Sequence, residues 1–408
     1  MNPQAPLQKR SFIITLGLLT TMAALTVDLS LPAVPAMVEA LSTSLSKGQQ
    51  IVGIFMVGMA LGQIPAGLIS DRIGRLPVMY AGMTLFAIGA TGAAMADNIE
   101  LMLAARLVQG AGASSAIVLS RAIVRDIASG KEAAKLMSLM TMIFTAAPVI
   151  APSIGALLVA QWGWRAPFIA IAIAGFLILT AIRSNLSETH IPIAGGHPVR
   201  QLVSSFSEFF SHRQSVFGLL LIILPPAGFM SIIALSAALA VEVYGYSIAE
   251  FGLIFATAGV SILLGAAINR LLVTRLESMR LIAIGVAIFG ISGLQLLIMA
   301  WLNQAPFIWL WGCVCQFMFT VAIVMPNAMV LALDPMPKIA GVASSIIGTL
   351  QNILGASGAI VGAMIYDGSV RNAVIIMGTV GVLVVCVFLL RPFICPHIVH
   401  HPDELARD

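Results

Sequence analysis

Charged residues are scarce in this sequence. Only 9% of its 408 residues are Asp, Glu, Lys or Arg, whereas 59% are hydrophobic, and the mean hydropathy is +1.02. Ordinary soluble domains carry about 25% charged residues and roughly 45–50% apolar ones. A soluble fold could not hide that much apolar surface from water. The composition therefore excludes an ordinary soluble protein and predicts a chain that lies mostly within a lipid bilayer.

Basic clusters and catalytic motifs are also missing. The net charge is only +4, and the basic residues are spread over short loops without a stripe suited to a nucleic-acid backbone. Nucleic acid is therefore not an expected partner. No Walker A lysine loop, nucleophile elbow or HExxH motif occurs, so we expect neither an enzyme nor ATP hydrolysis, and no cofactor.

Cysteine and histidine occur only in restricted regions. The four cysteines all lie in the C-terminal half and mostly in apolar runs: Cys313, Cys315, Cys386 and Cys395. Reduced packing cysteines are favoured over a metal site or a disulfide. The six histidines lie in the central polar segment or the C-terminal tail: His190, His197, His212, His397, His400 and His401. None is placed to relay protons inside a membrane, and a solvated tail is favoured over metal binding.

Long apolar runs are what the sequence does contain. A helix that spans a bilayer needs roughly 20 mostly apolar residues. One set of runs lies near 11–38, 49–69, 77–96, 100–121, 137–160 and 166–183, and a second near 215–240, 251–268, 280–301, 305–330, 341–364 and 370–391. We expect an all-α membrane protein with twelve spans: a bundle at 1–183, a linker at 184–212, a second bundle at 213–391 and a tail at 392–408.

The first run follows Lys9 and Arg10, which would also suit a cleaved signal peptide. Because eleven further runs follow, a retained first helix is favoured.

The basic residues indicate the orientation of these spans. Short cytoplasmic loops of membrane proteins carry an excess of Lys and Arg. With the N-terminus inside, 17 of the 21 basic residues are cytoplasmic: Lys9, Arg10, Arg72, Arg75, Arg121, Arg125, Lys131, Lys135, Arg183, Arg200, Arg213, Arg270, Arg275, Arg280, Lys338, Arg391 and Arg407. Lys47, Arg165 and Arg371 lie outside, and Arg106 falls within a span. This bias predicts a multi-pass protein of a bacterial inner membrane with both termini in the cytoplasm.

The two halves share a short repeated pattern. Gly67-Leu-Ile-Ser-Asp71-Arg72 lies at the junction between spans 2 and 3, and Gly265-Ala-Ala-Ile-Asn269-Arg270 lies at the junction between spans 8 and 9. Parallel repeats of a six-helix unit are typical of one transporter architecture, in which the substrate binds near the bilayer midplane where the halves face each other.

Further motifs suggest a family. They are Asp28-Leu-Ser-Leu-Pro32-Ala-Val-Pro35, Gly67-Leu-Ile-Ser-Asp71-Arg72-Ile-Gly74-Arg75, Arg106-Leu-Val-Gln109-Gly110, Pro148-Val-Ile-Ala-Pro152-Ser-Ile-Gly155 and Ala340-Gly341-Val-Ala-Ser344-Ser345. By these motifs the chain resembles the major facilitator superfamily, and within it the twelve-span drug/proton antiporters of the Bcr/CflA group. The resemblance implies two bundles that rock about a central cavity lined mainly by spans 1, 4, 7 and 10, and proton-coupled efflux of small amphipathic compounds.

Asp28 and Arg106 are the expected proton-coupling residues. Ionisable residues inside spans are costly, and function is the default hypothesis for them. Asp28 could bind a proton from one side and release it to the other, unless Pro32 and Pro35 end the helix early and leave it at the hydrated outer interface. Arg106 is the expected partner of Asp28, and the resemblance implies a role in proton transfer. The alternative is that Arg106 extends to the outer headgroups.

A cytoplasmic gate is expected in the turn after the second span. Gly67 would allow close helix approach and Gly74 would relax the backbone. Asp71 is a plausible partner for the N-terminal end of span 11 near Gly341 and for charges across the cytoplasmic face. Contacts of this kind would hold the cytoplasmic side closed, and a charged turn that only fixes topology is the alternative. The full set of gate candidates is Gly67, Asp71, Arg72, Gly74, Arg75, Arg125 and Asp126. Leu76 and Pro77 stand where the family has a further basic residue.

The remaining candidates concern the fifth span and the cavity. Pro148, Pro152 and Gly155 would loosen the helix that the resemblance associates with antiport, although ordinary packing explains them too. The expected cavity residues are Gln109, Phe144, Phe229 and Asn327, with methionines as adaptable walls.

Three functions stay open from the sequence. The first is drug export in exchange for protons, with a small-molecule substrate, protons and lipid as partners of a monomer. The second is proton-coupled transport of a sugar, amino acid or organic acid, for which spans 7 and 10 contain few polar side chains. The third is a membrane sensor that transports nothing.

Overall fold

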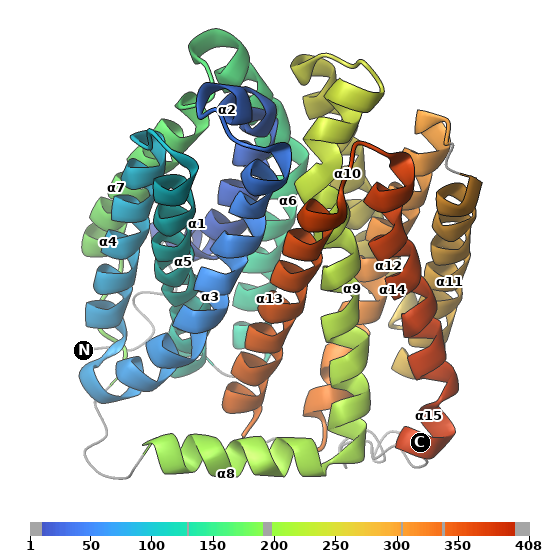
Figure 1. Cartoon of the computed structure of the whole chain (residues 1–408). Coiled ribbons are helices and arrows are strands. Elements are labelled where there is room, and N and C mark those ends of the chain that lie inside the picture. Colours follow the sequence, from blue (N-terminus) through green and yellow to red (C-terminus); the bar gives the residue numbers. More distant parts are fainter. Residues whose placement is uncertain (1–9, 129, 191–197, 303–304, 337–338, 396–408) are drawn as a thin grey trace. The chain divides into compact units, whose positions relative to one another are not determined.

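The computed structural model describes residues 10–128, 130–190, 198–302, 305–336 and 339–395, and these residues form helices joined by short turns (Figure 1). The helices are α1 (Arg10–Ser30), η1 (Leu31–Ala33), α2 (Val34–Ala40), α3 (Leu45–Ile73), α4 (Arg75–Ala94), α5 (Ile99–Ile127), α6 (Gly130–Trp162), α7 (Ala166–Asn185), α8 (Pro198–Ser211), α9 (Arg213–Ala238), η2 (Leu239–Val243), α10 (Ile248–Leu272), α11 (Ser278–Leu302), α12 (Phe307–Leu333), α13 (Ala340–Ile365), α14 (Val370–Leu389) and α15 (Arg391–Ile394).

The expected membrane architecture is confirmed. Eleven helices in the described part of the chain are long and apolar enough to cross a bilayer, and α6 contributes a shorter apolar stretch at Ala147–Trp162. Each of the twelve apolar runs predicted from the sequence coincides with one of these helices or, for the first, with α1, η1 and α2 together. The chain is therefore a multi-pass membrane protein.

Side-chain caps explain where several helices begin. Ser44, Asn98 and Ser369 each accept a hydrogen bond from the backbone N–H three residues later, which satisfies a free donor in the first turn of α3, α5 and α14. At the other end of α3, Gly74 has a φ of 102°, a conformation that favours glycine, and the chain turns there directly into α4.

The first span does not end at its prolines, as one alternative from the sequence required. After α1 the chain passes through one 3₁₀ turn, η1, into α2, and Pro32 and Pro35 lie in the first turns of these two short helices. Proline is tolerated there because its missing N–H would have no partner in a first turn. Asp28 consequently lies two residues before the end of α1 but twelve residues before the end of the span at Ala40, or about 18 Å along a helix axis.

The linker contains a helix that the sequence analysis did not predict. In Figure 1, α8 lies beneath the lower end of α13 and leads into the start of α9, and it contacts α13. Phe209 is buried and Phe206 is half-buried, whereas Ser207, Glu208 and Ser211 are exposed, so the helix is amphipathic. Its apolar residues are too few for a span, which is why hydropathy alone gave a polar linker.

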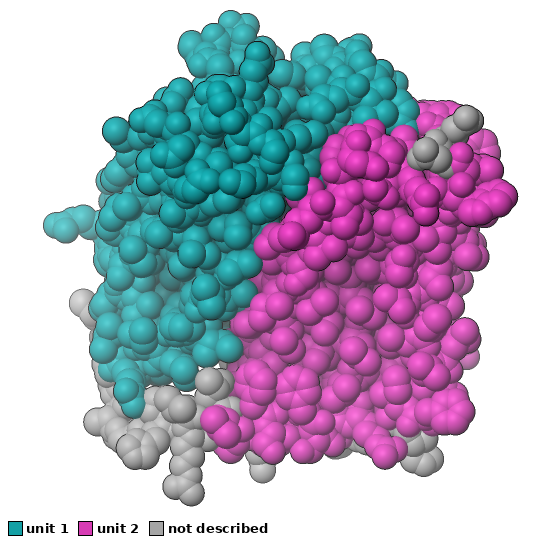
Figure 2. All heavy atoms as spheres, in the orientation of Figure 1, with its two compact units in different colours: residues 1–195, 234–259 teal, residues 196–233, 260–408 magenta. Residues whose placement is uncertain are grey.

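Two compact units divide the chain (Figure 2). Unit 1 comprises Met1–Gly195 and Ala234–Gly259, and unit 2 comprises Gly196–Ile233 and Val260–Asp408. Within unit 1, α5 packs against α3 and α4, and α1 packs against α6; within unit 2, α11 packs against α12 and α14. The helices α9 and α10 each contribute residues to both units.

Glycine sets the close contact between α3 and α5. A Cβ atom added at Gly110 would collide with the backbone carbonyl oxygen of Phe55, and one added at Gly58 would collide with that of Leu107. Gly67 differs from the sequence-based expectation of close approach. A Cβ atom there would lie 3.7 Å from Val118, which is ordinary van der Waals contact.

Gly110→Ala should therefore destabilise the protein, whereas Gly67→Ala should not. The added methyl group at Gly110 forces two backbones apart, and overpacking of this kind costs about 1–3 kcal/mol. The unfolding midpoint in detergent measures both variants, and Gly67→Ala serves as the control in the same helix pair. Equal midpoints for the two variants would contradict this account of the α3–α5 contact.

Candidate functional site

Asp28 is a buried acid in the first membrane-spanning segment. Its side chain is 6% exposed, and it is the one acidic side chain that is buried within the described ranges. Among the described residues, no side chain or backbone group forms a hydrogen bond or an ion pair with its carboxylate. The hydroxyl of Thr26, two residues earlier, is also buried without a hydrogen-bond partner. An unpaired carboxyl group in such a place is costly, and it is chemically suited to exchange a proton.

Arg106 is fully buried in α5, and its guanidinium points at neighbouring protein groups. Its Nη1 donates to Oε1 of Gln109 at 2.9 Å, and its Nε donates to the backbone oxygen of Ile51 at 3.3 Å. The guanidinium carbon lies 4.6 Å from the ring centroid of Phe55 and 5.9 Å from that of Phe168. These contacts exclude the alternative in which Arg106 extends to lipid headgroups, because no exposed surface remains on its side chain.

Asp28 and Arg106 do not form the expected direct pair in this structure. Aromatic rings, an amide oxygen and a carbonyl oxygen surround the guanidinium in place of the carboxylate, and among the described residues no ion pair joins the two. Two donors nevertheless stay unpaired beside each other on α5, namely Nη2 of Arg106 and Nε2 of Gln109. Buried polar groups usually have a partner, so these two N–H groups are available to a substrate or to a carboxylate.

Gly155 of α6 lies in close contact with α1 beside Asp28. A Cβ atom on Gly155 would collide with the backbone oxygen of Leu29, the residue after Asp28. α6 continues as a helix through Pro148 and Pro152. The missing side chain at Gly155 therefore lets the backbone of α6 contact the backbone that carries the buried acid.

The same segment of α6 contacts the part of α10 that belongs to unit 1. A Cβ atom on Gly259 would lie 2.7 Å from the carbonyl carbon of Pro148, and one on Gly252 would lie 3.0 Å from Cα of Ser153. Ser153 also donates its hydroxyl to the backbone oxygen of Gly252 at 3.1 Å. Two glycines that are seven residues apart thus face one side of α6.

Arg75 joins the predicted gate residues into a cluster. Its guanidinium donates to Asp126 at 2.9 Å, to the hydroxyl of Ser70 at 2.8 Å, and also to Asp71. The side chain of Arg75 is 9% exposed, and those of Asp126 and Asp71 are 18% and 57% exposed. We call Ser70, Asp71, Arg75 and Asp126 the Arg75 cluster. It connects the end of α3, the start of α4 and the end of α5.

Two other gate candidates lie apart from the cluster. Arg72 and Arg125 are exposed, and within the part of the chain that the structure describes neither forms an ion pair. The expected contact between Asp71 and the start of α13 would join the two units, and it stays a prediction.

Glu188 was missed as a site residue by the sequence analysis. It follows α7, and its carboxylate accepts hydrogen bonds from the backbone N–H groups of Arg75 and Leu76, both at 2.9 Å. Burial opposes ionisation of this carboxyl group, but bonds from Leu76, Arg75, His190 and Thr189 hold its pKa below the usual range. No local signal in the sequence could have found it, because the helix start that it caps lies more than a hundred residues away.

The expected cavity residues lie in different surroundings. Gln109 is buried against Arg106, Phe229 is half-buried in α9, and the side chain of Phe144 lies outside the described residues. Asn327 is 3% exposed, and its amide donates to Oδ1 of Asn269 and to the backbone oxygen of Ile323, both at 2.7 Å. In this structure Asn327 therefore joins α12 to α10.

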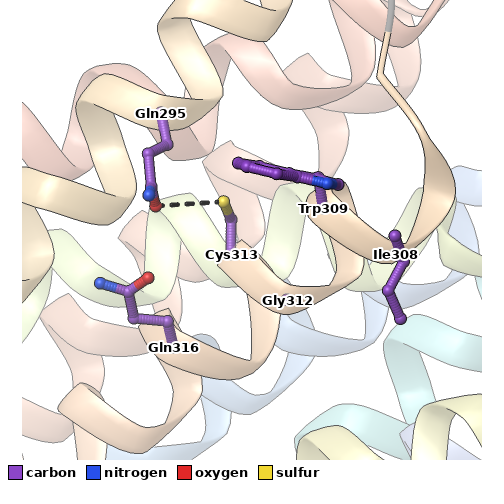
Figure 3. A pocket seen from close by; sticks show the side chains of 6 residues that line it. All are labelled: Gln295, Ile308, Trp309, Gly312, Cys313 and Gln316. Carbon is purple, nitrogen blue, oxygen red and sulfur yellow. Dashed lines mark hydrogen bonds between the residues drawn. The ribbon is translucent and has the colours of Figure 1, made fainter.

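A separate pocket lies between α11 and α12 in unit 2 (Figure 3). It has a volume of about 400 Å³ and is lined by Gln295, Ile308, Trp309, Gly312, Cys313 and Gln316. The thiol of Cys313 donates to Oε1 of Gln295 at 3.3 Å. The pocket is wide open and contains no charged side chain, so it offers neither a proton site nor a gate.

Comparisons with known proteins match this chain to one family model and to similar bacterial proteins. The family model described as Major Facilitator Superfamily matches residues 16–359. A bicyclomycin resistance protein homolog of Haemophilus influenzae is 28% identical over 391 residues, which cover 94% of this chain and 96% of that protein. The MFS-type transporter YdgK of Bacillus subtilis, which is described as uncharacterized, is 30% identical over 357 residues. These residues cover 85% of this chain and 87% of that protein.

Further relatives and solved structures extend the comparison. The multidrug resistance protein MdtL of Escherichia coli is 31% identical over 238 residues, covering 58% of this chain and 60% of that protein. A D-xylose–proton symporter has a similar structure, with a TM-score of 0.77 at 18% identity, over 96% of this chain and 98% of its own. The structure of a peptide transporter in complex with sulfate has a TM-score of 0.74 at 14% identity, and the match covers 94% of each chain. These structures support the fold alone.

Arg75→Lys should loosen the Arg75 cluster even though the charge is kept. A lysine ammonium cannot replace the planar guanidinium that bonds Asp126, Ser70 and Asp71 at once. We expect a loss of about 1–2 kcal/mol, after a discount for the exposure of Asp71, visible as a lower unfolding midpoint in detergent. Arg72→Lys is the matched control, three residues away and exposed. The account is wrong if both variants melt together.

Proposed function

Because the chain belongs to the major facilitator superfamily, we propose that it exports small amphipathic compounds in exchange for protons by alternating access. The observation that carries the proposal is Asp28, a buried and unpaired acid in a membrane-spanning helix whose backbone contacts α6. Members of this family carry small molecules, commonly together with protons, and this acid is the one described group suited to take up the proton.

The proposed cycle depends on the charge of Asp28. When Asp28 is ionised, it attracts the cationic or polar part of a bound compound and the free donors of Arg106 and Gln109. When a proton from outside binds, the carboxyl group becomes neutral and this attraction is lost, so the compound leaves outward. Each elementary charge that falls through about 100 mV supplies roughly 2.3 kcal/mol, which corresponds to a gradient of about 50-fold.

Contact between α1 and α6 would transmit the change. Gly155 leaves no gap between α6 and the backbone at Leu29, so a movement of α1 at Asp28 displaces α6 as well. α6 in turn contacts α10 at Gly252 and Gly259. Protonation would thereby bias the helices that must move in alternating access.

The proposed substrate class is supported by the names of two relatives and by the amino-acid composition. Two relatives are named for resistance to bicyclomycin or to several drugs. The sequence contains 21 methionines and 19 phenylalanines, which suit varied apolar molecules. A sugar or carboxylate carrier would need more polar or basic side chains in α9 and α12, where few occur. We therefore favour drugs over metabolites.

The proposal includes a location. The excess of basic residues in alternate loops favours a bacterial inner membrane with both termini in the cytoplasm, and a monomer suffices for the cycle. The Arg75 cluster would then lie on the cytoplasmic side and would act as the gate.

Asp28→Asn should abolish drug-driven proton movement. The amide has the size of the carboxyl group but cannot bind and release a proton, so the coupling has no carrier. Proteoliposomes loaded with a pH-sensitive dye measure proton release after addition of a cationic dye, a quinolone or a chloramphenicol-type compound. We expect a full signal from the control Asp97→Asn, because Asp97 is 87% exposed and forms only a surface pair with Arg165.

Two outcomes would oppose the proposal. Proton release that survives Asp28→Asn would show that another group carries the proton. A wild-type protein that moves no proton with any compound, although it is folded and correctly inserted, would instead favour the sensor. Growth of cells that express the chain on a panel of antibiotics would narrow the substrates further.

A further inference from the structure

The short segment after α7 folds back onto the start of α4. Oε1 of Glu188 accepts the N–H of Arg75 at 2.9 Å, and Oε2 accepts the N–H of Leu76 at 2.9 Å. The same carboxylate accepts the N–H groups of Thr189 and His190, both at 3.1 Å. One side chain thus fixes the backbone of two segments that are more than a hundred residues apart in the sequence.

The start of α4 needs such a partner. Its first N–H groups have no acceptor within the helix, and they form the positive end of the helix dipole. Gly74 stands at the N-cap position and has no side chain that could cap them. A side chain at Gly74 would also be obstructed, because a Cβ atom would lie 2.6 Å from Oε2 of Glu188 and the φ of 102° is strained for other residues. The cap therefore comes from the segment after α7.

The next two residues bind the Arg75 cluster itself. The hydroxyl of Thr189 donates to Oδ2 of Asp126 at 3.2 Å. The ring of His190 lies with Nε2 at 3.2 Å from the backbone oxygen of Asp71 and with Nδ1 at 3.5 Å from Nη2 of Arg75. Three consecutive residues consequently contact the end of α3, the start of α4 and the end of α5.

We propose that Glu188 is a positioning residue for transport, which fastens the segment 188–190 to the start of α4 and thereby holds Arg75 between Asp71 and Asp126. The inference rests on the proposed function, because the Arg75 cluster is its gate. It adds that the segment that follows α7 is attached, through Glu188, to the helix start that carries Arg75 of the gate. Among the described residues, Asp28 is not one of the groups that bond to Glu188.

The role has a kinetic consequence. A carboxylate that only positions the gate affects the rate at which the transporter changes state, and it leaves the binding of substrate at a distant site unchanged. Loss of Glu188 should therefore reduce the maximal rate of antiport about tenfold, the effect of losing one charge-assisted hydrogen bond, with KM unchanged. A residue needed only for folding would lower the amount of active protein and leave the rate per folded molecule unchanged.

Hydrogen–deuterium exchange tests the contact directly on the full-length protein in detergent. In Glu188→Gln one neutral acceptor oxygen replaces two charged ones, and in Glu188→Ala none remains. We expect exchange at the amides of Arg75 and Leu76, and at those of Thr189 and His190, to accelerate about tenfold in Glu188→Ala and less in Glu188→Gln. Glu208→Gln, an exposed acid on α8, is the matched control and should leave these four amides unchanged.

Antiport by the same variants in proteoliposomes completes the test. A lower maximal rate with unchanged KM in Glu188→Ala, together with partial rescue in Glu188→Asp, supports the positioning role. Unchanged exchange at Arg75 and Leu76 would overturn the contact, and accelerated exchange with an unchanged maximal rate would overturn its role in transport. If wild-type protein performs no antiport, the proposed function fails, whereas the exchange data still decide whether Glu188 fastens the two segments.

Discussion

The cost of placing a charge in a membrane protein governs this structure. Three charged side chains are buried among the described residues, namely Asp28, Arg75 and Arg106. Two of them are compensated: Arg75 by two carboxylates, and Arg106 by the ring of Phe55, an amide and a carbonyl oxygen. Asp28 alone lacks a partner in the described part of the chain. An uncompensated acid is tolerable in a membrane if it can become neutral, and that ability is what a proton-coupled carrier requires.

The two halves differ in the charge that they place at equivalent positions of the repeated pattern. All three buried charges belong to unit 1. Where unit 1 places Asp71 at the end of α3, the repeated segment in unit 2 places Asn269, whose amide oxygen accepts from Asn327 at 2.7 Å. A neutral amide pair needs no counter-charge and does not respond to protons. The buried charges on which the proposed coupling depends therefore lie in unit 1, whereas the described part of unit 2 contains no buried charged side chain.

Much of the fold could be predicted because hydropathy is a local property. Twenty apolar residues in a row predict a span wherever it packs, and glycine at position 74 predicts a turn. The partners of Arg106 could not be predicted, since they depend on which way a long side chain points between α3, α5 and α7. Glu188 was missed because its role arises from a contact between positions 188 and 75, and the sequence marks neither residue as belonging to the other. Gly67 matches the family pattern, yet the close crossing lies at Gly58 and Gly110.

The glycine contacts also explain how a small event at Asp28 could have a large effect. Transfer of one proton changes a side chain by a single bond and moves its neighbours little. At Leu29, however, the backbone of α1 already touches Gly155, and the backbone of α10 touches Pro148 and Ser153. Contacts between backbones cannot be absorbed by rotation of a side chain, because no side chain lies between the helices. In the proposed cycle, a displacement at Asp28 would therefore be passed on as the movement of whole helices.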